Sequence, residues 1–278
     1  MKKLIINADD FGLNDAATDA IAECFLNGAV TSTTMIVNSP SVYRAASFAR
    51  SNPGLGVGLH FNLTWGKPIS SAASIPALVS PNGEFHSRER LAKLLLLCRV
   101  PRSQINRELY AQLDRFRSLG LEPTHVDSHQ HIHAFHPVFS LVANCCKQLS
   151  LPVRVPWVAP ESGASFSRRF RRFALRLLLY RATIPWKRKV VWNDQLGSVF
   201  DVSALGLPIR DDHYRLILAS FEKGVFELMV HPVKDSSAMN GYTGIGDVSE
   251  SEWLYLRNGH IVQLAKDLDY QLITYRDI

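Results

Sequence analysis

The feature that most restricts the fold of this chain is an alternation of short apolar runs with helical patterns along most of its length. Apolar runs typical of buried strands occur at residues 3–8, 30–38, 56–63, 125–133, 152–155, 226–230 and 271–275. Patterns typical of helices lie between them, at residues 15–27, 41–50, 103–119, 138–149, 214–222 and 250–268. Such alternation implies parallel βα units. Seven or eight units in 278 residues predict an α/β fold, a closed or nearly closed (β/α) barrel of mostly parallel strands.

We expect a single domain over residues 1–278, because the chain contains no internal repeat and no low-complexity linker. Two segments interrupt the alternation. Residues 66–100 form an excursion, with three prolines and an Asn82-Gly83 turn before a leucine-rich helix. Residues 164–190 form a basic segment, which we interpret as a helical insertion within the barrel.

The composition is that of a globular enzyme, with 46% hydrophobic and 20% charged residues, which excludes a disordered, collagen-like or coiled-coil chain. No run approaches about 18 apolar residues, so we expect no membrane-spanning helix. The first six residues hold too few apolar side chains for a signal peptide. The four cysteines lack the spacing of a disulfide framework. We therefore expect a cytoplasmic protein with reduced thiols.

The net charge of +6 is a local feature of the chain. Residues 164–190 contain nine basic residues and no acidic one, and the rest of the chain carries 22 basic and 25 acidic residues. A basic surface suited to nucleic acid is therefore not expected.

The basic segment has the pattern of an amphipathic helix. On a helical wheel, one side collects the apolar residues Phe166, Phe170, Phe173, Ala174, Leu177 and Leu178. The other side collects Arg168, Arg169, Arg172 and Arg176. Such a helix packs ordinarily against the barrel with its basic face in solvent. An alternative is contact with an anionic membrane surface or a lipid-linked sugar, which would place the protein at the periphery of the inner membrane.

Polar residues at the carboxyl ends of barrel strands are usually catalytic, because the loops at that face form the active site. Asp9 and Asp10 directly follow the first predicted strand. Two adjacent buried carboxylates are costly unless they share a cation or a proton. Successive side chains of a strand point in opposite directions, so the two acids should have different roles. The alternative interpretation is a helix cap and a turn.

Histidines gather at the ends of two other predicted strands. His60 ends the third strand, and five of the ten histidines lie within residues 125–136. If strand geometry continues through this segment, His125, Asp127, His129, His131 and His133 alternate onto one face. Imidazole is a common ligand for zinc and similar ions, and a nearby carboxylate orients it. Asp10, His60 and His129 would then form a two-histidine, one-carboxylate site with open positions, as in hydrolytic metal centres. A histidine-rich loop in solvent, and a structural role for His60, are the alternatives.

Two further residues are candidates for the chemistry. His231 follows the strand at 226–230 and is a candidate general acid, or a core or loop histidine. Arg154 is a cation inside an apolar strand, and such a charge usually has a buried carboxylate partner, for which Asp9 is suitable.

These motifs resemble those of the YdjC-like carbohydrate deacetylase family, which includes the chitooligosaccharide deacetylases. The matching stretches are Asn7–Gly12, Asn27–Thr34, Gly58–Thr64, Pro123–His133 and Glu227–Pro232. The resemblance implies a deacetylase-type β/α barrel, one divalent metal ion (magnesium or zinc) and removal of an N-acetyl group from an acetylated sugar or glycan. It also implies a cytoplasmic protein that forms a homodimer.

Within the matched motifs, the resemblance makes Asp9 the base and Asp10, His60 and His129 the metal ligands, with His131 as the alternative to His129. Two departures matter. Val233 stands where the family usually has a glycine after the His-Pro pair, and the basic segment is longer than compact chitooligosaccharide enzymes need. Their substrate is therefore not assumed.

The mechanism predicted from these residues is hydrolysis by a metal-activated water. Asp9 takes the proton of this water, His231 protonates the departing amine, and Arg154 orients Asp9. Two other functions remain open: a phosphoesterase on a similar barrel, with spare histidines binding a second metal, and a sugar- or lipid-binding protein without catalysis.

Overall fold

The structure, a computed structural model, describes residues 1–157, 166–202, 206–219 and 221–278. In this part of the chain, seven strands form one sheet in which every pair is parallel. They are β1 (Lys2–Phe11), β2 (Ser32–Met35), β3 (Gly56–Phe61), β4 (Val126–Ser128), β5 (Gln195–Gly197), β6 (Gly224–Val230) and β7 (Tyr270–Leu272). The order is β4-β3-β2-β1-β6-β5, and β7 pairs with the beginning of β1.

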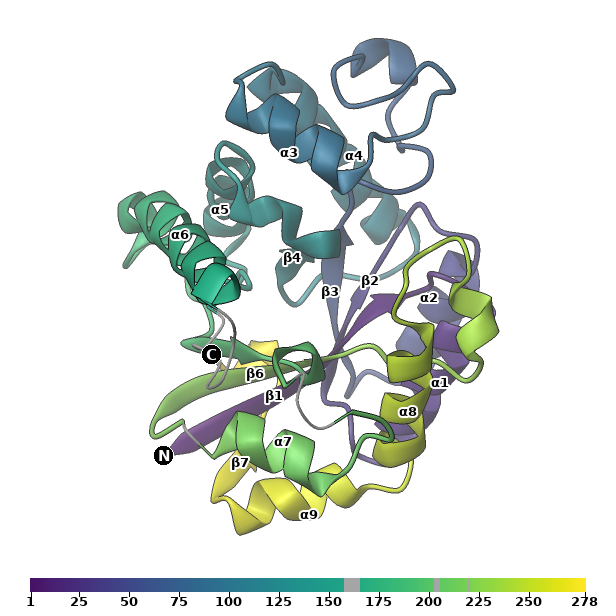
Figure 1. Cartoon of the computed structure of the whole chain (residues 1–278). Coiled ribbons are helices and arrows are strands. Elements are labelled where there is room, and N and C mark those ends of the chain that lie inside the picture. The colour runs from purple at the N-terminus through teal and green to yellow at the C-terminus, as the bar shows by residue number, and fades with distance from the viewer. Residues whose placement is uncertain (158–165, 203–205, 220) are drawn as a thin grey trace.

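Helices cover the outside of this sheet, as Figure 1 shows. The α-helices of the described residues are α1 (Asp15–Leu26), α2 (Val42–Ser51), α3 (Arg88–Leu96), α4 (Arg102–Ser118), α5 (Val138–Leu149), α6 (Phe166–Thr183), α7 (Asp211–Leu218), α8 (Gly246–Leu256) and α9 (His260–Asp267). Helix α4, for example, buries one apolar stripe, formed by Ile105, Leu109, Leu113 and Phe116.

The curled sheet is nearly closed between its two edge strands. Val153 forms isolated parallel bridges with Val126 of β4 and with Trp192, three residues before β5. The amide of Leu196 in β5 also donates to the carbonyl of Trp157. The segment 152–157 thus fills the gap between β4 and β5. The predicted α/β fold, a (β/α) barrel of mostly parallel strands, is confirmed.

Several predicted elements differ in detail. The strand at 152–155 is reduced to the bridges of Val153, and β5 was not predicted because three residues give too little periodic signal. The helix predicted at 250–268 is two helices, α8 and α9. Between them Gly259 has a φ of +71°, a left-handed conformation that glycine adopts at little cost and that ends a helix.

The predicted strand 125–133 is wrong beyond Ser128. β4 ends there and the chain continues as a 3-10 helix, His129–Ala134, in which Gln130 and His131 both have a φ of 54°. The left-handed turn breaks the alternation of side chains. The predicted single face of alternating histidines therefore does not form.

The excursion at 66–100 extends from the carboxyl end of β3 and contains α3 (Figure 1). The buried carboxylate of Glu108 in α4 holds its beginning by accepting from the amides of Ile69 and Ser70, each at 2.9 Å.

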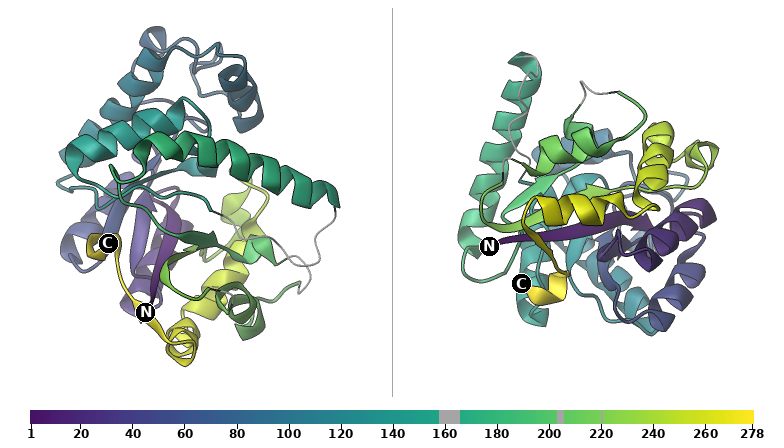
Figure 2. Two further views of the ribbon diagram at one scale, coloured as in Figure 1. Left: turned by 90° about the vertical axis from the view of Figure 1, so that its left-hand side faces the viewer. Right: turned by 90° about the horizontal axis from the view of Figure 1, so that it is seen from below.

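Helix α6 lies beside α5, and Figure 2 shows it lengthwise on the outside of the molecule. Leu179 and Ala182 are buried, whereas Phe173, Leu177 and Leu178 are 65%, 45% and 51% exposed. These three residues of the predicted apolar side are therefore largely exposed, and the prediction that this side is buried against the barrel is wrong for them. Phe166, Phe170, Ala174, Arg168, Arg169 and Arg172 have side chains outside the described part. None of the described helices is long and apolar enough to span a membrane.

Candidate metal centre and catalytic residues

A bulge at the end of β1 separates the two adjacent acids. The register between β1 and β2 shifts between Ala8 and Phe11, and Asp10 has a φ of 68°. A left-handed conformation is strained for a residue other than glycine and persists where the surroundings enforce it, often at functional sites. The turn sends Asp10 toward two histidines and leaves Asp9 facing Arg154. The prediction that the two carboxylates diverge agrees with this geometry.

Asp10, His60 and His129 form a compact buried group. Oδ1 of Asp10 lies 2.9 Å from Nδ1 of His129 and 3.3 Å from Nε2 of His60. The ligand atoms of the three residues all lie within 4.8 Å of one another. They come from the ends of β1, β3 and β4, which the parallel sheet brings to one edge. Two imidazoles and one carboxylate fit a divalent ion of the zinc type, with positions left for water and substrate.

The electrostatics of this group also suit a cation. Burial raises the pKa of Asp10, but His129 and His60 outweigh this effect and hold its pKa well below the usual range. Burial lowers the pKa of His60, whereas Asp127 and Asp10 raise it to about 10. The carboxylates around His60 thus favour a positive charge at this place, which a metal ion satisfies as well as a proton does.

Asp127 and Thr34 orient His60. Nδ1 of His60 lies 2.7 Å from Oδ1 of Asp127 and 3.0 Å from the hydroxyl of Thr34, which donates to the other oxygen of Asp127. This contact directs Nε2 of His60 toward Asp10, as carboxylates behind metal-binding histidines do. A second group, Asp9, His60 and Asp127, is similarly compact. It is less suited to a metal, because both of its carboxylates already pair with Arg154.

Arg154 is fully buried and pairs with three carboxylates. Nη1 and Nη2 donate to the two oxygens of Asp9 at 2.7 and 2.6 Å, and Nη1 lies 2.6 Å from Oδ2 of Asp127. Nε donates to Glu227 at 2.8 Å. The structure contains the expected pair with Asp9 and adds two partners that the sequence did not reveal. Burial raises the pKa of Asp9, but Arg154 outweighs it and keeps its pKa below the ordinary value.

His231 lies on the other side of Asp9. Its Nε2 is 3.9 Å from Oδ2 of Asp9, its side chain is 14% exposed, and its ring contacts Phe200 edge-on. Nδ1 has no hydrogen-bond partner among the described residues. Burial lowers the pKa of His231, and the negative charges of Asp9 and Asp10 offset part of this effect. The neighbouring Val233 is accommodated in a small apolar cluster with Leu13 and Met239.

The other histidines of the 125–136 segment do not join the group. The ring of His125 stacks on the ring of Tyr275, with 3.7 Å between the two ring centroids. It also packs so closely on Gly58 that a Cβ at this position would lie 2.5 Å from Cε1 of His125. His133 contacts Ser128 and the carbonyl of Arg154. His131, the alternative ligand, belongs to neither compact group. Among the described residues, the other compact group, Asp9, His60 and Asp127, shares His60 with the first.

Glu252 is a buried carboxyl that sequence reasoning did not single out. Its oxygens accept from the amide of His231 at 2.8 Å and from the hydroxyl of Tyr214 at 3.0 Å. Glu252 thereby fixes the backbone that carries His231. Burial raises its pKa to about 8.

The raised pKa of Glu252 predicts a specific dependence of stability on pH. An unfolded chain releases this proton near pH 4.3 and the folded protein only at about pH 8. The free energy of unfolding should therefore fall between these values as pH rises. Glu252→Gln mimics the protonated form and should remove this loss. Urea unfolding across this range measures it, with the exposed Glu222→Gln as control. A difference from wild type that stays constant with pH would show that Glu252 is ionised throughout.

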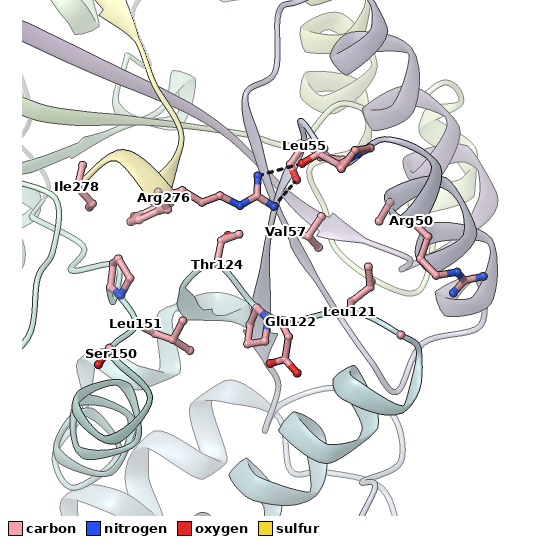
Figure 3. A pocket seen from close by; sticks show the side chains of 16 residues that line it. Arg50, Leu55, Val57, Leu121, Glu122, Thr124, Ser150, Leu151, Arg276 and Ile278 are labelled. Atoms are coloured by element: carbon pink, nitrogen blue, oxygen red, sulfur yellow. Dashed lines mark hydrogen bonds between the residues drawn. The ribbon is translucent and has the colours of Figure 1, made fainter.

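A cavity of about 600 Å³ lies at the opposite end of the barrel (Figure 3). Its lining includes Leu55 and Val57 at the start of β3, and Arg276. The guanidinium of Arg276 donates to the carbonyls of Pro53 and Leu55, so it is engaged by the main chain. The residues around Asp10 do not line this cavity, so it is separate from the candidate metal centre.

The model of the family described as YdjC-like protein matches residues 3–267. A carbohydrate deacetylase of Brevibacillus brevis is 31% identical, with 99% of each chain covered. A chitooligosaccharide deacetylase of Proteus mirabilis is 35% identical, with 99% of this chain and 98% of that protein covered. A carbohydrate deacetylase of Geobacillus stearothermophilus is 46% identical over 150 residues, a match that spans 54% of this chain and 58% of that protein.

Among solved structures, a proposed cellobiose-phosphate cleavage protein of Enterococcus faecalis superimposes with a TM-score of 0.77 at 25% identity. The superposition covers 99% of this chain and 98% of that one. The same architecture therefore recurs over the full length.

Proposed function

Because the chain belongs to the YdjC-like protein family, whose relatives include carbohydrate deacetylases, we propose that it is a metal-dependent hydrolase that removes an N-acetyl group from an acetylated amino sugar or glycan. The observation that carries the proposal is the buried group of Asp10, His60 and His129 beside Asp9. A cation site next to a separate carboxylate is the arrangement that hydrolysis of an amide requires.

Asp10, His60 and His129 would hold the metal ion, which when bound polarises the acetamide carbonyl and lowers the pKa of water. Asp9 is the base: Arg154 keeps it ionised, and a carboxylate oxygen accepts the proton of the attacking water. Nε2 of His231 delivers a proton to the amine nitrogen, since an amine anion is too basic to leave. Oδ2 of Asp9, 3.9 Å from Nε2 of His231, favours the protonated form of this ring.

The decisive experiment is release of acetate. The purified protein, loaded with Mg²⁺ or Zn²⁺, is incubated with a panel of N-acetylated oligosaccharides, their phosphorylated forms and N-acetylated glycolipids. We include phosphorylated sugars because the similar Enterococcus protein is described for cellobiose-phosphate cleavage. Acetate release that a chelator abolishes and the metal restores supports the proposal. Binding of these sugars without turnover would instead support a sugar-binding protein without catalysis. We also propose that the protein forms a homodimer, and analytical sedimentation of the same sample measures its oligomeric state.

The role of His231 predicts a change in the pH profile. In the wild type, kcat should follow a bell-shaped curve, because Asp9 must be ionised and His231 protonated in the enzyme–substrate complex. His231→Ala should lose the alkaline limb and about 100-fold in rate. An unaltered profile in this variant would assign the acid elsewhere.

We also propose that α6 contacts an anionic membrane surface or a lipid-linked substrate. Phe173, Leu177 and Leu178 are exposed beside the exposed Arg176 and Arg181. Apolar side chains flanked by cations bind anionic bilayers. The protein should sediment with vesicles that contain phosphatidylglycerol, less so at high salt, and not with neutral vesicles. Leu177→Gln should weaken binding, whereas Leu254→Gln, at an equally exposed leucine of α8, should not. Absence of sedimentation at low salt would refute the contact.

A further inference from the structure

The guanidinium of Arg154 is held along two edges. One edge, Nη1 and Nη2, pairs with both oxygens of Asp9. The other edge, Nε and Nη2, donates to a single oxygen of Glu227, at 2.8 and 2.5 Å. A planar group bound along two edges has no freedom to rotate. The direction of the contact with Asp9 therefore depends on what holds Glu227.

Glu227 is held in turn by the end of the chain. It lies in β6, is fully buried, and its second oxygen accepts a hydrogen bond from the hydroxyl of Tyr275. Tyr275 follows β7, which pairs with the beginning of β1. Its ring is fully buried and stacks on His125 with an interplanar angle of 12°. Both oxygens of Glu227 are thus engaged, one by Arg154 and one by Tyr275.

We propose that Glu227 and Tyr275 are positioning residues for the reaction. They hold the guanidinium of Arg154 in the plane in which it pairs with both oxygens of Asp9. Neither residue contacts the Asp10 group, so each acts on the base through Arg154. The inference rests on the proposed function, because the orientation of Asp9 matters for a reaction only if Asp9 is the base of a hydrolase.

Competition between carboxylates explains why such positioning is needed. Nη1 of Arg154 lies 2.7 Å from Oδ2 of Asp9 and 2.6 Å from Oδ2 of Asp127, so the two carboxylates share this donor. Without Glu227, Nε of Arg154 loses its hydrogen-bond acceptor. The guanidinium can then turn toward Asp127, which would break its paired hydrogen bonds with Asp9. A buried donor without a partner is costly, so such a rotation is expected.

The test uses the mildest variants available. Tyr275→Phe removes only the hydroxyl and keeps the stack on His125, and Glu227→Gln keeps the shape while removing one acceptor oxygen. Tyr270→Phe is the matched control: Tyr270 is a buried tyrosine of β7 whose hydroxyl donates to the carbonyl of Leu218, away from Arg154. If the inference is correct, Tyr275→Phe and Glu227→Gln lower kcat at least about tenfold, with KM and bound metal unchanged, and Tyr270→Phe does not.

A second measurement is independent of activity. The Nε–H of Arg154, bonded to buried Glu227, should give a ¹H–¹⁵N NMR signal that exchanges slowly with solvent and is missing in Arg154→Lys. Tyr275→Phe and Glu227→Gln should shift this signal and speed its exchange, and Tyr270→Phe should leave it unchanged.

These two readouts separate the possible failures. If the wild type releases no acetate from any sugar but the NMR signal responds as expected, the proposed function is wrong, although Glu227 and Tyr275 do hold the guanidinium of Arg154. If the wild type is active but Tyr275→Phe retains its kcat within about twofold and its NMR signal, the positioning role is refuted. If the signal moves and kcat does not, Glu227 and Tyr275 serve structure alone, and the inference is again refuted.

Discussion

Asp9→Asn is expected to keep its metal ion and lose at least about 100-fold in turnover, whereas its neighbour Asp10→Asn is expected to lose the metal itself. Asn at position 10 offers a neutral amide oxygen, a far weaker ligand for a divalent cation than a carboxylate. Asn at position 9 keeps the shape but is not basic, and it leaves Asp10, His60 and His129 in place.

Bound metal and turnover should therefore respond differently at the two adjacent positions: Asp9→Asn should lose only turnover, and Asp10→Asn should also lose the metal. Metal content by mass spectrometry and kcat on the same samples provide both. The matched control is Asp19→Asn, because Asp19 carries an exposed ion pair with Arg44 outside the site. Equal loss of metal from Asp9→Asn and Asp10→Asn would make both acids ligands. Normal turnover in Asp9→Asn would refute the assigned base.

Arg154→Met is expected to lower the free energy of unfolding by about 3–5 kcal/mol at neutral pH, the usual cost of removing one partner from a buried ion pair. The variant leaves Asp9, Asp127 and Glu227 buried together without their shared cation. Methionine fills a similar volume, so loss of packing contributes little. The cost is electrostatic, which makes it dependent on pH.

The sign of this dependence follows from Asp9 and Asp127. In the wild type Arg154 lowers the pKa of both carboxyls, so their contribution to stability is present above the unfolded pKa and lost as pH falls through the folded pKa. Without Arg154 burial raises these pKa values instead. The difference between variant and wild type should therefore be largest near neutral pH and shrink toward about pH 4.

Urea unfolding at both pH values measures this effect. Arg44→Met, which breaks the exposed pair with Asp19, is the control and should cost at most about 1 kcal/mol. An equal effect of Arg154→Met at neutral and acidic pH would mean that lost packing, not charge, explains it.

Local sequence sufficed for much of the site. His60 and Asp10 were placed correctly at strand ends, because a strand and its terminus are defined by a few neighbouring residues. His129 directly follows β4, so its position did not depend on the conformation of the segment after it. The same reasoning failed for His131 and His133, since a left-handed turn at residues 130 and 131 has no signal in a run without glycine.

The sequence by itself determined the parallel α/β architecture, since the period of apolar residues reports which face of each element is buried. It also determined which polar residues stand at the carboxyl ends of the strands. Only the tertiary structure decided what those residues meet. Glu227 is 73 residues from Arg154 and Tyr275 is 48 residues from Glu227. Contacts at such separations depend on the order of strands in the sheet and on the closure of the barrel through Val153. These contacts are attractions and hydrogen bonds between buried groups, and their strength depends on an environment that no local pattern of residues records.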